Sequence, residues 1–561
     1  MGFWQLGNTS VRSAMRIRDG LIAYSTSTIQ GDIRGADGDI AFRSLLGSCG
    51  VVSLGEDDTN SVGRKWRSAM GKLGFIYPEI SDDMGFPQTD LGQLDIITPA
   101  GWNLIRAETV PAMQECYLRA MVTPVFPMEN NLKFSPLCWT LSLLLELDRR
   151  NESPSISFIE MALIVQTTNP SNGLGETVDR IIELRNRRNA AERKKVFDRI
   201  EYDNAAEVFN RATRTFKDYA DMNIRYLKAT GMVRAYGKGI TLVSEKRALA
   251  IALSREAVSD KSWIELYRSL CNGNVLPTDN ATVAYQVLED LLQQLQQYNI
   301  DFTLEGRLLD TPAHINQARY EIEQIIAERK EEVYAFEQAN AWREIAAYMD
   351  LIASRRDYMR LNEEVEIKVP RAEAPAYLEW SLWRAFLAID TLVNKPYQVR
   401  RFNVDQDFMP VSTAPGNGPD LIAEFDDCVV VIEVTLSESS RQEAMEGEPV
   451  RRHIADLMLQ YNKPVYGLFI ANRIDSNTAE TFRIGVWYTR DDDRMSLKIV
   501  PFTLTQFSSY FKAIFASETA TPQSIVSLIE ECETCRQHFE APEWKQEIGN
   551  IVNAKCAALA N

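Results

Sequence analysis

Long apolar runs are missing from this sequence, and that absence excludes a membrane protein. None of its 561 residues lies in an apolar stretch of about 20, the length that a membrane-spanning helix needs. The first residues lack the charged-then-apolar plan of a signal peptide, and Leu6 stands where a myristoylation motif requires serine or threonine. We therefore expect a cytoplasmic protein with no membrane partner.

The eight cysteines lack the pattern of a disulfide framework, which is typical of a protein in a reducing compartment. One spacing, Cys532 and Cys535 followed by His538, is that of part of a zinc site. No fourth ligand is evident nearby in the sequence. Two cysteines on a helix surface are the simpler interpretation.

Basic charge is also scarce for a protein that would bind nucleic acid, because the formal net charge is −17. Residues 1–255 contain 32 Lys and Arg against 30 Asp and Glu, a net of +2, so the remaining 306 residues carry −19. Basic side chains are thus relatively concentrated in the first part. Contact with DNA there would have to be local, on one face. The length predicts about three domains.

The first half contains an order of elements that occurs twice. Residues 59–73 are typical of a helix that stops at Gly74. Apolar segments at 75–77 and 96–98 follow, and a second helix begins after them. Helix, glycine, strand, turn, strand and helix is the order of a winged helix, whose helix before the wing enters the major groove of DNA.

The second copy begins with a helix at 218–230, which Gly231 ends. A strand entered at 232–233 and another at 239–242 lead into a helix from Ser244. We therefore predict an α-rich N-terminal part with two winged-helix DNA-recognition subdomains, residues 1–150 and 151–255. The alternative is that each unit only packs against its neighbour.

Side chains that can form paired hydrogen bonds with base edges are the candidates for recognition, since arginine suits guanine and asparagine suits adenine. A basic run at 185–195 is more typical of a phosphate-contacting or solvated face than of a sequence reader. Asn8 and Arg12 belong to a polar, basic opening that could contact the backbone or the target. The candidate base readers are Arg64, Lys65, Arg67, Asn223 and Arg225.

Residues 256–371 have the apolar spacing of helices almost throughout, and we interpret them as a helical linker that holds the recognition half at a set distance from the rest. Residues 372–561 open with a helix at 374–390 and continue with strands and helices. A buried strand at 465–471, further strands at 484–488 and 497–502 and a helix at 448–461 predict an α/β domain with a mixed sheet.

The stretch around which this domain is organised is a β-hairpin that carries acids. Leu421 to Phe425 and Cys428 to Leu436 are strand-like, and a two-residue turn joins them. If Phe425 pairs with Cys428, then Asp420 lies opposite Glu433, with Thr435 on the same face.

Opposed like charges destabilise a sheet, so this arrangement predicts a hard cation such as Mg²⁺ between the two carboxylates. The main-chain carbonyl of Val434 would be a third oxygen ligand. The alternative is a solvated hairpin with scattered acids. We favour the metal site because Val429 to Ile432 is an unbroken apolar run, typical of a buried strand where an unpaired carboxylate is costly.

The sequence around these acids resembles a known family. Pro419-Asp420 and Glu433-Val434-Thr435 are similar to the core of PD-(D/E)xK nucleases, with Thr435 where the lysine usually stands. The segments at 416–420, 440–453 and 467–478 and the opening at 4–12 resemble type IIS restriction endonucleases of the AlwI, PleI and MlyI group, which includes strand-specific nicking enzymes.

The resemblance implies a C-terminal PD-(D/E)xK nuclease domain, at residues 372–561, that hydrolyses DNA with Mg²⁺ a few base pairs to one side of a short asymmetric site. It places Glu379, from the first helix of the domain, at the metal; an acid that is merely favourable near a helix N-terminus is the alternative. It also implies a further acid about thirteen residues after Glu433, which is Glu446, flanked by Glu443 and Glu448.

Thr435 cannot carry the charge of the missing lysine, so a replacement is required. Arg451, Arg452 and His453 could face the scissile phosphate, or they could be exposed helix residues. The partners implied are double-stranded DNA and, for the second strand, a transient homodimer or a small second subunit, in the cytoplasm of a prokaryote. The alternatives are a nicking enzyme, the large subunit of a heterodimer, a repair or transposition nuclease, or a non-catalytic winged-helix regulator.

Overall fold

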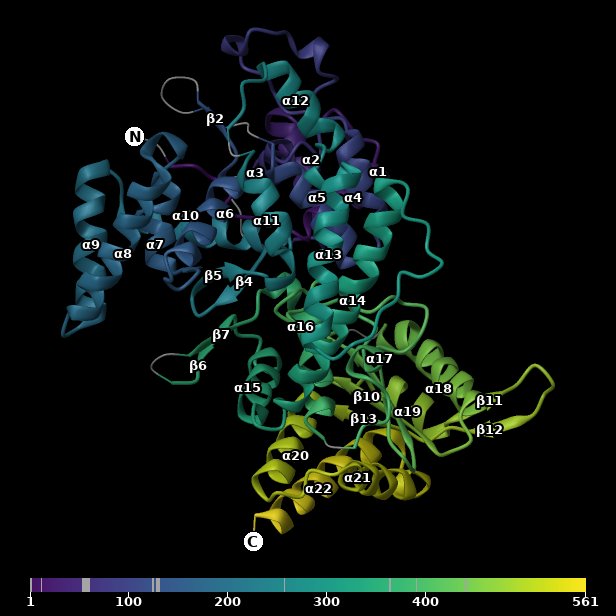
Figure 1. The fold of residues 1–561 in the computed structure, drawn as a ribbon. Coiled ribbons are helices and arrows are strands. Elements are labelled where there is room, and N and C mark those ends of the chain that lie inside the picture. The colour runs from purple at the N-terminus through teal and green to yellow at the C-terminus, as the bar shows by residue number, and fades with distance from the viewer. Residues whose placement is uncertain are drawn as a thin grey trace. The chain divides into compact units, whose positions relative to one another are not determined.

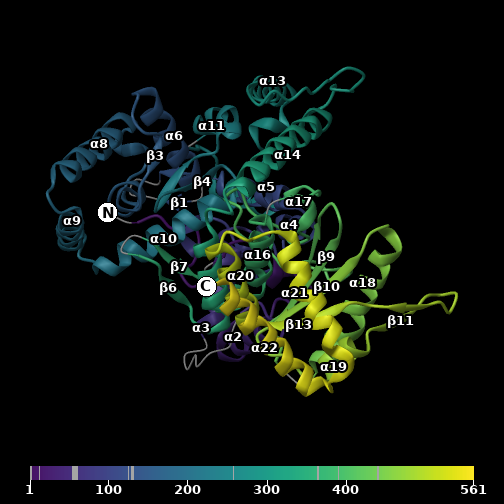
Figure 2. The ribbon, with the colours of Figure 1, turned by 90° about the horizontal axis from the view of Figure 1, so that it is seen from below.

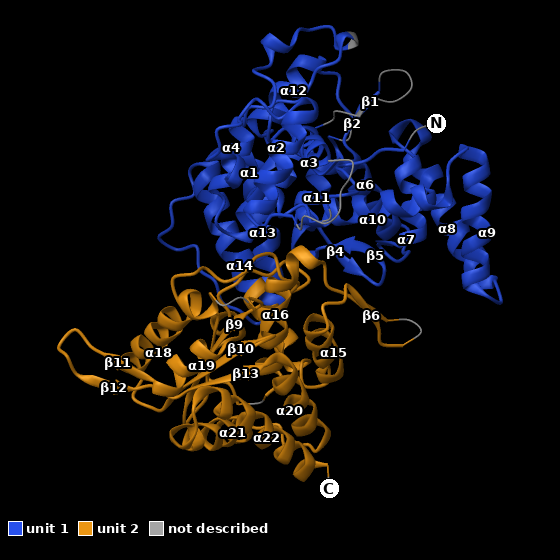
Figure 3. Cartoon of the chain, turned by 180° about the vertical axis from the view of Figure 1, so that it is seen from behind, with its two compact units in different colours: residues 1–326 blue, residues 327–561 orange. Residues whose placement is uncertain are grey.

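The structure, a computed structural model, describes residues 3–11, 13–52, 61–123, 126–127, 132–256, 258–362, 365–389, 391–438 and 441–560. The chain forms two compact units, Met1–Ile326 and Ala327–Asn561 (Figure 3). Both are rich in helices, and the sheets are small (Figure 1). None of the helices in the described part of the chain combines the length and the apolar character needed to cross a bilayer.

Unit 1 consists mainly of helices, joined by short strands and loops. Its strands are β1 (Phe126–Pro127), β2 (Lys133–Phe134), β3 (Ser155–Ile156), β4 (Val233–Tyr236) and β5 (Gly239–Leu242). Its helices are α1 (Ile17–Ser25), α2 (Gly35–Ser48), α3 (Ser61–Lys72), α4 (Pro99–Arg106), α5 (Val110–Met121), α6 (Pro136–Arg149), α7 (Phe158–Leu163), α8 (Leu174–Ala190), α9 (Lys194–Phe209), α10 (Thr213–Ala229), α11 (Arg247–Ser254), α12 (Trp263–Asn272), α13 (Ala281–Gln297) and α14 (Pro312–Phe336), which contains the boundary between the units.

In the second predicted repeat α10 directly precedes β4, which pairs with β5, and the earlier strand β3 completes an antiparallel sheet in the order β3-β5-β4. Gly231 has φ +68° and ends α10, a conformation that L side chains rarely adopt. The helix begins at Thr213, earlier than the predicted start at 218, and α11 begins at Arg247 after one 3₁₀ turn. The order helix, glycine, strand, turn, strand and helix is present.

The first predicted repeat has less sheet. Ile76 and Ile97 form an isolated antiparallel bridge, extended by hydrogen bonds from Tyr77 N to Ile96 O (2.9 Å) and from Thr98 N to Phe75 O (3.1 Å). The Thr98 hydroxyl accepts from the N–H of Gly101 at 3.0 Å and so caps α4. The predicted order is present here too, with paired segments in place of regular strands.

The predicted helical linker, 256–371, is not a separate body. Its helices α12 and α13 pack on α4, α5 and α11 within unit 1. Its last helix, α15 (Trp342–Ala353), packs on helices of unit 2, and a small hairpin of β6 (Tyr358–Arg360) and β7 (Glu366–Lys368) follows it. The apolar stripes that predicted these helices are the faces by which α12 and α13 pack within unit 1 and α15 packs within unit 2.

Unit 2 is built on a four-stranded sheet in the order β13-β10-β9-β8, with bounds Ile499–Thr503, Val465–Ala471, Val429–Thr435 and Leu421–Glu424. The strands β9, β10 and β13 are parallel, and β8 is antiparallel to β9 at one edge. Leu421 pairs with Ile432, which confirms the hairpin register predicted from the sequence. Every residue of β10 is buried, as the unbroken apolar run predicts for a central parallel strand.

Helices of unit 2 cover the sheet. The helix α16 (Ala374–Leu387) packs on β8 and β9, and α18 (Glu448–Gln460) packs on β10. The C-terminal helices α20 (Leu504–Ala516) and α21 (Pro522–Cys535) pack on β10 and β13, and α22 (Ala541–Leu559) packs on both helices (Figure 2). The remaining helices are α17 (Pro396–Val399) and α19 (Ser476–Ile484).

One expectation for unit 2 needs correction. The predicted strand at 484–488 is split, because Ile484 ends α19 and β11 (Val486–Tyr488) pairs with β12 (Arg494–Ser496) in a separate hairpin that projects from the unit (Figure 1). The helix predicted at 374–390 is present as α16. Trp380, Trp383 and Phe386 are buried as well as Leu378 and Leu382, so α16 is enclosed on nearly all sides.

Candidate active site

The hairpin of β8 and β9 brings two carboxylates to one edge of the sheet. Glu433 lies on β9, is buried, and pairs in register with Phe469 of β10. Asp420 directly precedes β8, and its Oδ2 accepts a hydrogen bond from the N–H of Val434 at 2.8 Å. The register opposes Asp420 to Glu433, and this bond fixes the aspartate beside the main chain that carries the glutamate.

A third carboxylate comes from α16. Glu379 is buried, and its Oε2 accepts a hydrogen bond from the N–H of Ala414 at 2.7 Å. The pKa of Glu379 is raised to about 9, mainly by burial, and the charges of Asp420 and Glu433 contribute to this shift. The interpretation of Glu379 as an ordinary acid near a helix N-terminus is therefore the weaker one, because its charge interacts with the hairpin acids.

A fourth carboxylate, Glu446, lies in a π-helical turn (Glu443–Gly447) that leads into α18. Its side chain forms a hydrogen bond with Thr435, and burial raises its pKa. Of the three glutamates considered from the sequence, Glu446 is the one whose charge acts on Asp420 and Glu433. Glu443 instead accepts from the Thr481 hydroxyl at 3.2 Å, and Glu448 is exposed and paired with Arg452 at 3.1 Å.

His453, on α18, completes the cluster. Its Nδ1 lies 2.7 Å from Oε1 of Glu433, and its Nε2 is buried without a hydrogen-bond partner in the structure. Burial lowers the pKa of His453, so the ring is neutral at pH 7 and the contact is a hydrogen bond. The next residue, Ile454, packs on Gly467 of β10 where a Cβ atom would collide with it, and this close approach seats α18 against the sheet.

Burial, more than their mutual repulsion, favours the protonated forms of these acids. Burial, with the nearby charge of Glu446, raises the pKa of Glu433 to about 8, and burial with the charge of Glu433 raises the pKa of Asp420 to about 8. A divalent cation would remove the repulsion that contributes to these shifts.

The donor set fits a hard cation through oxygen atoms. Asp420 and Glu433 can supply carboxylates, and Val434 can supply its main-chain carbonyl. In the described part of the chain, no three His, Cys, Asp or Glu side chains are gathered as a ready-made metal site. Water would therefore have to fill the other positions, as is usual for Mg²⁺.

One cationic side chain at this site was not singled out from the sequence. Arg401 follows α17, and its guanidinium donates to Asn417 Oδ1 at 2.6 Å on the loop before Asp420. No spacing rule relates Arg401 to the acids, because a loop and not a regular element carries it. Arg451, which the sequence suggested, donates to the carbonyls of Gly447 and Val486 at 3.0 and 3.4 Å.

Two of the predicted base readers are instead structural residues of unit 1. Asn223 is fully buried; its Oδ1 accepts from the N–H of Leu6 at 3.0 Å, and its Nδ2 donates to Trp4 O and Gln166 Oε1, both at 3.2 Å. The guanidinium of Arg67 donates to the main-chain carbonyl of Ile33 and to the side-chain carboxylate of Asp39. Both predictions are corrected, since these side chains hold the N-terminal segment and α2 in place and are not available to DNA.

The other predicted DNA contacts stay predictions. Arg64 is exposed on α3, and Lys65 is half-buried beside it. Arg225 on α10 is paired with Asp221 at 2.8 Å. Asn8 is half-buried, and its Oδ1 accepts from the N–H of Ser10 at 3.0 Å. Arg12 lies outside the described residues.

Much of the basic run at 185–195 is occupied by neighbouring acids. Arg185 binds the buried Glu160 at 2.9 Å, and Arg188 binds Asp198 at 2.6 Å. Arg187 is paired with a glutamate of α9 at 2.7 Å. These ion pairs join α8 to α7 and α9, so these arginines of the run stabilise the packing of the three helices. Exposed cations remain at 193–195.

Two other features carry no chemistry of the acids. Cys532 is fully buried, and burial raises the pKa of its thiol, so the expected surface position was wrong for this cysteine.

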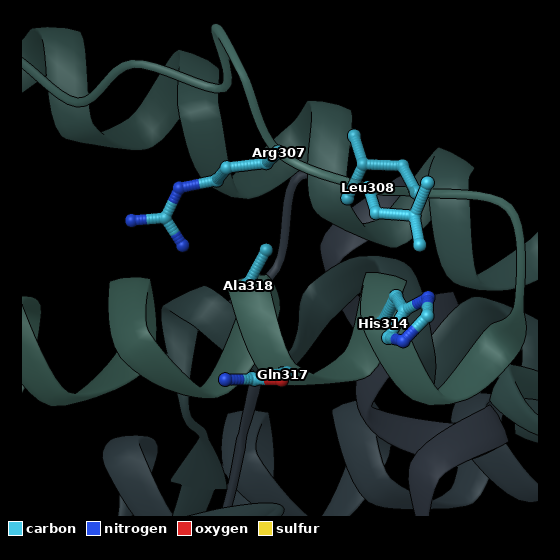
Figure 4. A pocket seen from close by; sticks show the side chains of 6 residues that line it. Arg307, Leu308, His314, Gln317 and Ala318 are labelled. Carbon is cyan, nitrogen blue, oxygen red and sulfur yellow. The ribbon is translucent and has the colours of Figure 1, made fainter.

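A pocket of about 200 Å³ lies in unit 1, where a loop passes over α14 (Figure 4). Its ionisable side chains are held by neighbours, His314 by Asp310 at 2.7 Å and Arg307 by Glu321 at 2.6 Å.

Comparison with known proteins gives one family. The family model described as AlwI restriction endonuclease matches residues 71–509, which include all the acids above. The chain has no significant match among curated proteins. Among solved structures, it is similar to the small subunit (R.BspD6I2) of the heterodimeric restriction endonuclease R.BspD6I, with 21% identity over 37% of this chain and 97% of that chain. The TM-score of 0.29 is too low for that likeness to carry an argument. On the extent of the family match, the chain belongs to the AlwI restriction endonuclease family.

Proposed function

We propose that this protein recognises a short asymmetric sequence in double-stranded DNA and hydrolyses phosphodiester bonds a few base pairs to one side, with Mg²⁺. The coarser statement follows from the family: the chain is a site-specific restriction endonuclease, a hydrolase that acts on DNA. The observation that carries the proposal is the convergence of Asp420, Glu433, Glu379 and Glu446, with raised pKa values, within one unit of the chain.

Asp420 and Glu433 would hold the ion together with the Val434 carbonyl, and this unit would then be a PD-(D/E)xK nuclease with threonine in place of the lysine. When bound, Mg²⁺ would supply Lewis acidity at the phosphate and lower the pKa of the attacking water. Glu379 would hold its hydrogen bond to Ala414 and supply further negative charge to the site.

Glu446, tied to Thr435, would accept the proton that the attacking water loses. His453 would fix the orientation of Glu433 through the 2.7 Å hydrogen bond between Nδ1 and Oε1. Thr435 thus orients Glu446 and His453 orients Glu433, and preorganised groups lower the cost of reaching the transition state.

Recognition is proposed for unit 1. The segment that contains α6, β3, α7, α10, β4 and β5 has the element order of a winged helix, and the β4-β5 hairpin would be its wing. Arg225 on α10, and Arg64 with Lys65 on α3, stay our candidates for contacts with bases. Asn8 would contact the backbone, and Arg12 is proposed from the sequence alone.

One cluster of acids in the described part of the chain can cut one strand at a time. Cleavage of both strands would need a transient homodimer or a small second subunit, and without either the enzyme would be a strand-specific nickase. Which of these applies is measured by the product, a nicked circle or a linear plasmid.

The test is digestion of a plasmid of mixed sequence with Mg²⁺, followed by sequencing of the ends. We expect ends at one fixed distance from one short site. Asp420→Ala and Glu433→Ala should abolish cleavage and leave specific binding in EDTA intact. Ends at random sequences would contradict site-specific recognition, and near-normal cutting by either variant would show that the metal site is misplaced.

A further inference from the structure

Arg401 lies on the loop that delivers Asp420 to the acid cluster. Its main-chain N–H donates to Asp420 O at 3.3 Å, and its guanidinium donates to Asn417 Oδ1 at 2.6 Å and to Pro419 O at 3.4 Å. One main-chain and two side-chain contacts with residues 417–420 therefore hold Arg401 beside the first carboxylate of the hairpin.

Gly418 makes this position possible. A Cβ atom built on Gly418 would collide with the guanidinium of Arg401, so the cation lies directly against the glycine. The backbone of Gly418 does not have a positive φ, and the reason for glycine here is the space that Arg401 occupies. The loop is thus shaped around the arginine.

The charge of Arg401 acts on the cluster, and no acid among the residues that the structure describes forms an ion pair with it. It lowers the pKa of Glu433 and also that of His453. Its side-chain hydrogen bonds in the described part of the chain go to uncharged oxygens, of an amide and a carbonyl. The adjacent Arg400 differs, because it is bound to the buried Glu331 at 2.7 and 2.8 Å.

The other cations near the acids are committed elsewhere. Arg451 is held by two carbonyls and lies over the ring of Trp487, and Arg452 is paired with Glu448. Thr435, which stands in the place of the lysine of related nucleases, bears no charge. Among the described arginines whose charge acts on Glu433 and His453, Arg452 is thus paired with an acid, and Arg401 is hydrogen-bonded to uncharged oxygens.

We propose that Arg401 contacts the scissile phosphate and takes the part of the missing lysine, an inference that rests on the proposed nuclease function. In the reaction, the oxygen of water forms a bond to phosphorus and gives one proton to a carboxylate. The bond from phosphorus to the leaving oxygen breaks, and that oxygen takes a proton from solvent. Negative charge grows on the non-bridging oxygens meanwhile, and a planar guanidinium can bind two of them at once.

The test compares Arg401→Ala and Arg401→Lys with the parental enzyme in single-turnover cleavage at saturating DNA. Loss of one donor to the transition state costs roughly 10²- to 10³-fold in rate, which we expect for alanine, and lysine should restore part of the loss. Binding in EDTA and the thermal unfolding of unit 2 should stay at parental values. Arg371→Ala removes an exposed cation of the same unit, paired with Asp357, and should cut normally.

A second variant separates a catalytic role from a structural one. Gly418→Ala should displace the guanidinium and slow cleavage, yet it should add nothing to Arg401→Ala, since both changes remove the same interaction. Arg400→Ala is the structural comparison, because it leaves Glu331 buried without its partner and should lower the unfolding temperature.

The outcomes separate the inference from the function on which it rests. Near-parental cleavage by Arg401→Ala, while Glu433→Ala is inactive, would overturn the role of Arg401 and leave the nuclease standing. If Arg401→Ala and Arg401→Lys lose the same amount of cleavage rate and both also lose thermal stability, the residue serves the fold, and the inference is again overturned. If the parental protein does not cut DNA with Mg²⁺, the proposed function itself fails.

Discussion

Replacing Glu433 by glutamine should stabilise the protein when no divalent cation is present. Glutamine has the shape of glutamate, and its Oε1 can still accept the hydrogen bond from His453 Nδ1. Glutamine cannot ionise, so the variant avoids the free-energy cost of folding that comes from placing an ionisable carboxyl group in a buried site beside other acids. An acid required for catalysis is thus expected to be unfavourable for folding.

The magnitude follows from the pKa of Glu433, which is raised from 4.5 to about 8. An acid with a raised pKa destabilises the folded state increasingly as pH rises from the ordinary value to the folded one, because the unfolded chain releases the proton first. At about pH 7.5 the difference is three pH units at about 1.4 kcal/mol each, or roughly 4 kcal/mol. Relaxation around the charge reduces this, and we expect about 2 to 4 kcal/mol.

The assay is calorimetric unfolding in EDTA at two pH values. For a unit of this size, 1 kcal/mol moves the midpoint by about 2–4 °C, so the unit 2 transition of Glu433→Gln should lie about 5 to 10 °C above the parental one near pH 7.5. Near pH 5.5 the stability gain of the variant should shrink to about 1 kcal/mol, since this pH lies only about one unit above the ordinary pKa of a glutamate. Glu448→Gln is the matched control, because Glu448 is exposed on α18 and should change little.

Magnesium should cancel most of this difference. It should raise the midpoint of the parental protein, by about 2.7 kcal/mol at a hundred times its dissociation constant, and should raise that of Glu433→Gln much less. A variant that is no more stable than the parental protein in EDTA near pH 7.5 would refute the reasoning, because burial and the charge of Glu446 would then not raise the pKa of Glu433 in the folded state.

Two further predictions concern the neighbours of the acids and the recognition unit. In single-turnover cleavage, Thr435→Ala should be mild and Glu446→Gln severe, because the threonine only holds the glutamate that takes the proton; equal rates for the two would reject that assignment. Asn223→Ala should lower the stability of unit 1 by about 2 to 3 kcal/mol, since Leu6 N and Gln166 Oε1 lose a buried partner. The cleaved sequence should not change, and a changed site would return Asn223 to the base readers.

The sequence predicted the hairpin well because its geometry is local. A short turn and the two-residue period of strands were enough to pair Leu421 with Ile432 and thereby to oppose Asp420 to Glu433. The buried parallel strand at Val465–Ala471 was predicted for a similar reason, since an unbroken apolar run of that length has few other uses.

Predictions that depended on tertiary packing were less successful. Asn223 and Arg67 have the chemistry of base readers, and only the folded chain reveals that Leu6 and Asp39 occupy them. Arg401 was missed because it is brought to the acids by a loop, without a period or spacing that a sequence can display. The linker was predicted from correct helices, but helix faces do not say to which neighbour they belong.

The π-helical turn Glu443–Gly447 places Glu446 between two fixed points. On one side, Gln442 is fully buried and donates to Ser437 O and Arg473 O at 2.7 and 2.9 Å. On the other side, α18 is seated on the sheet through Ile454. One residue more than an α-helical turn fits between these anchors, and each residue of a helix turns the chain by about 100°. Deleting one residue of the turn would therefore rotate Glu446 away from Thr435 and leave His453 where it is, so that the reach of this acid is encoded in the length of the segment.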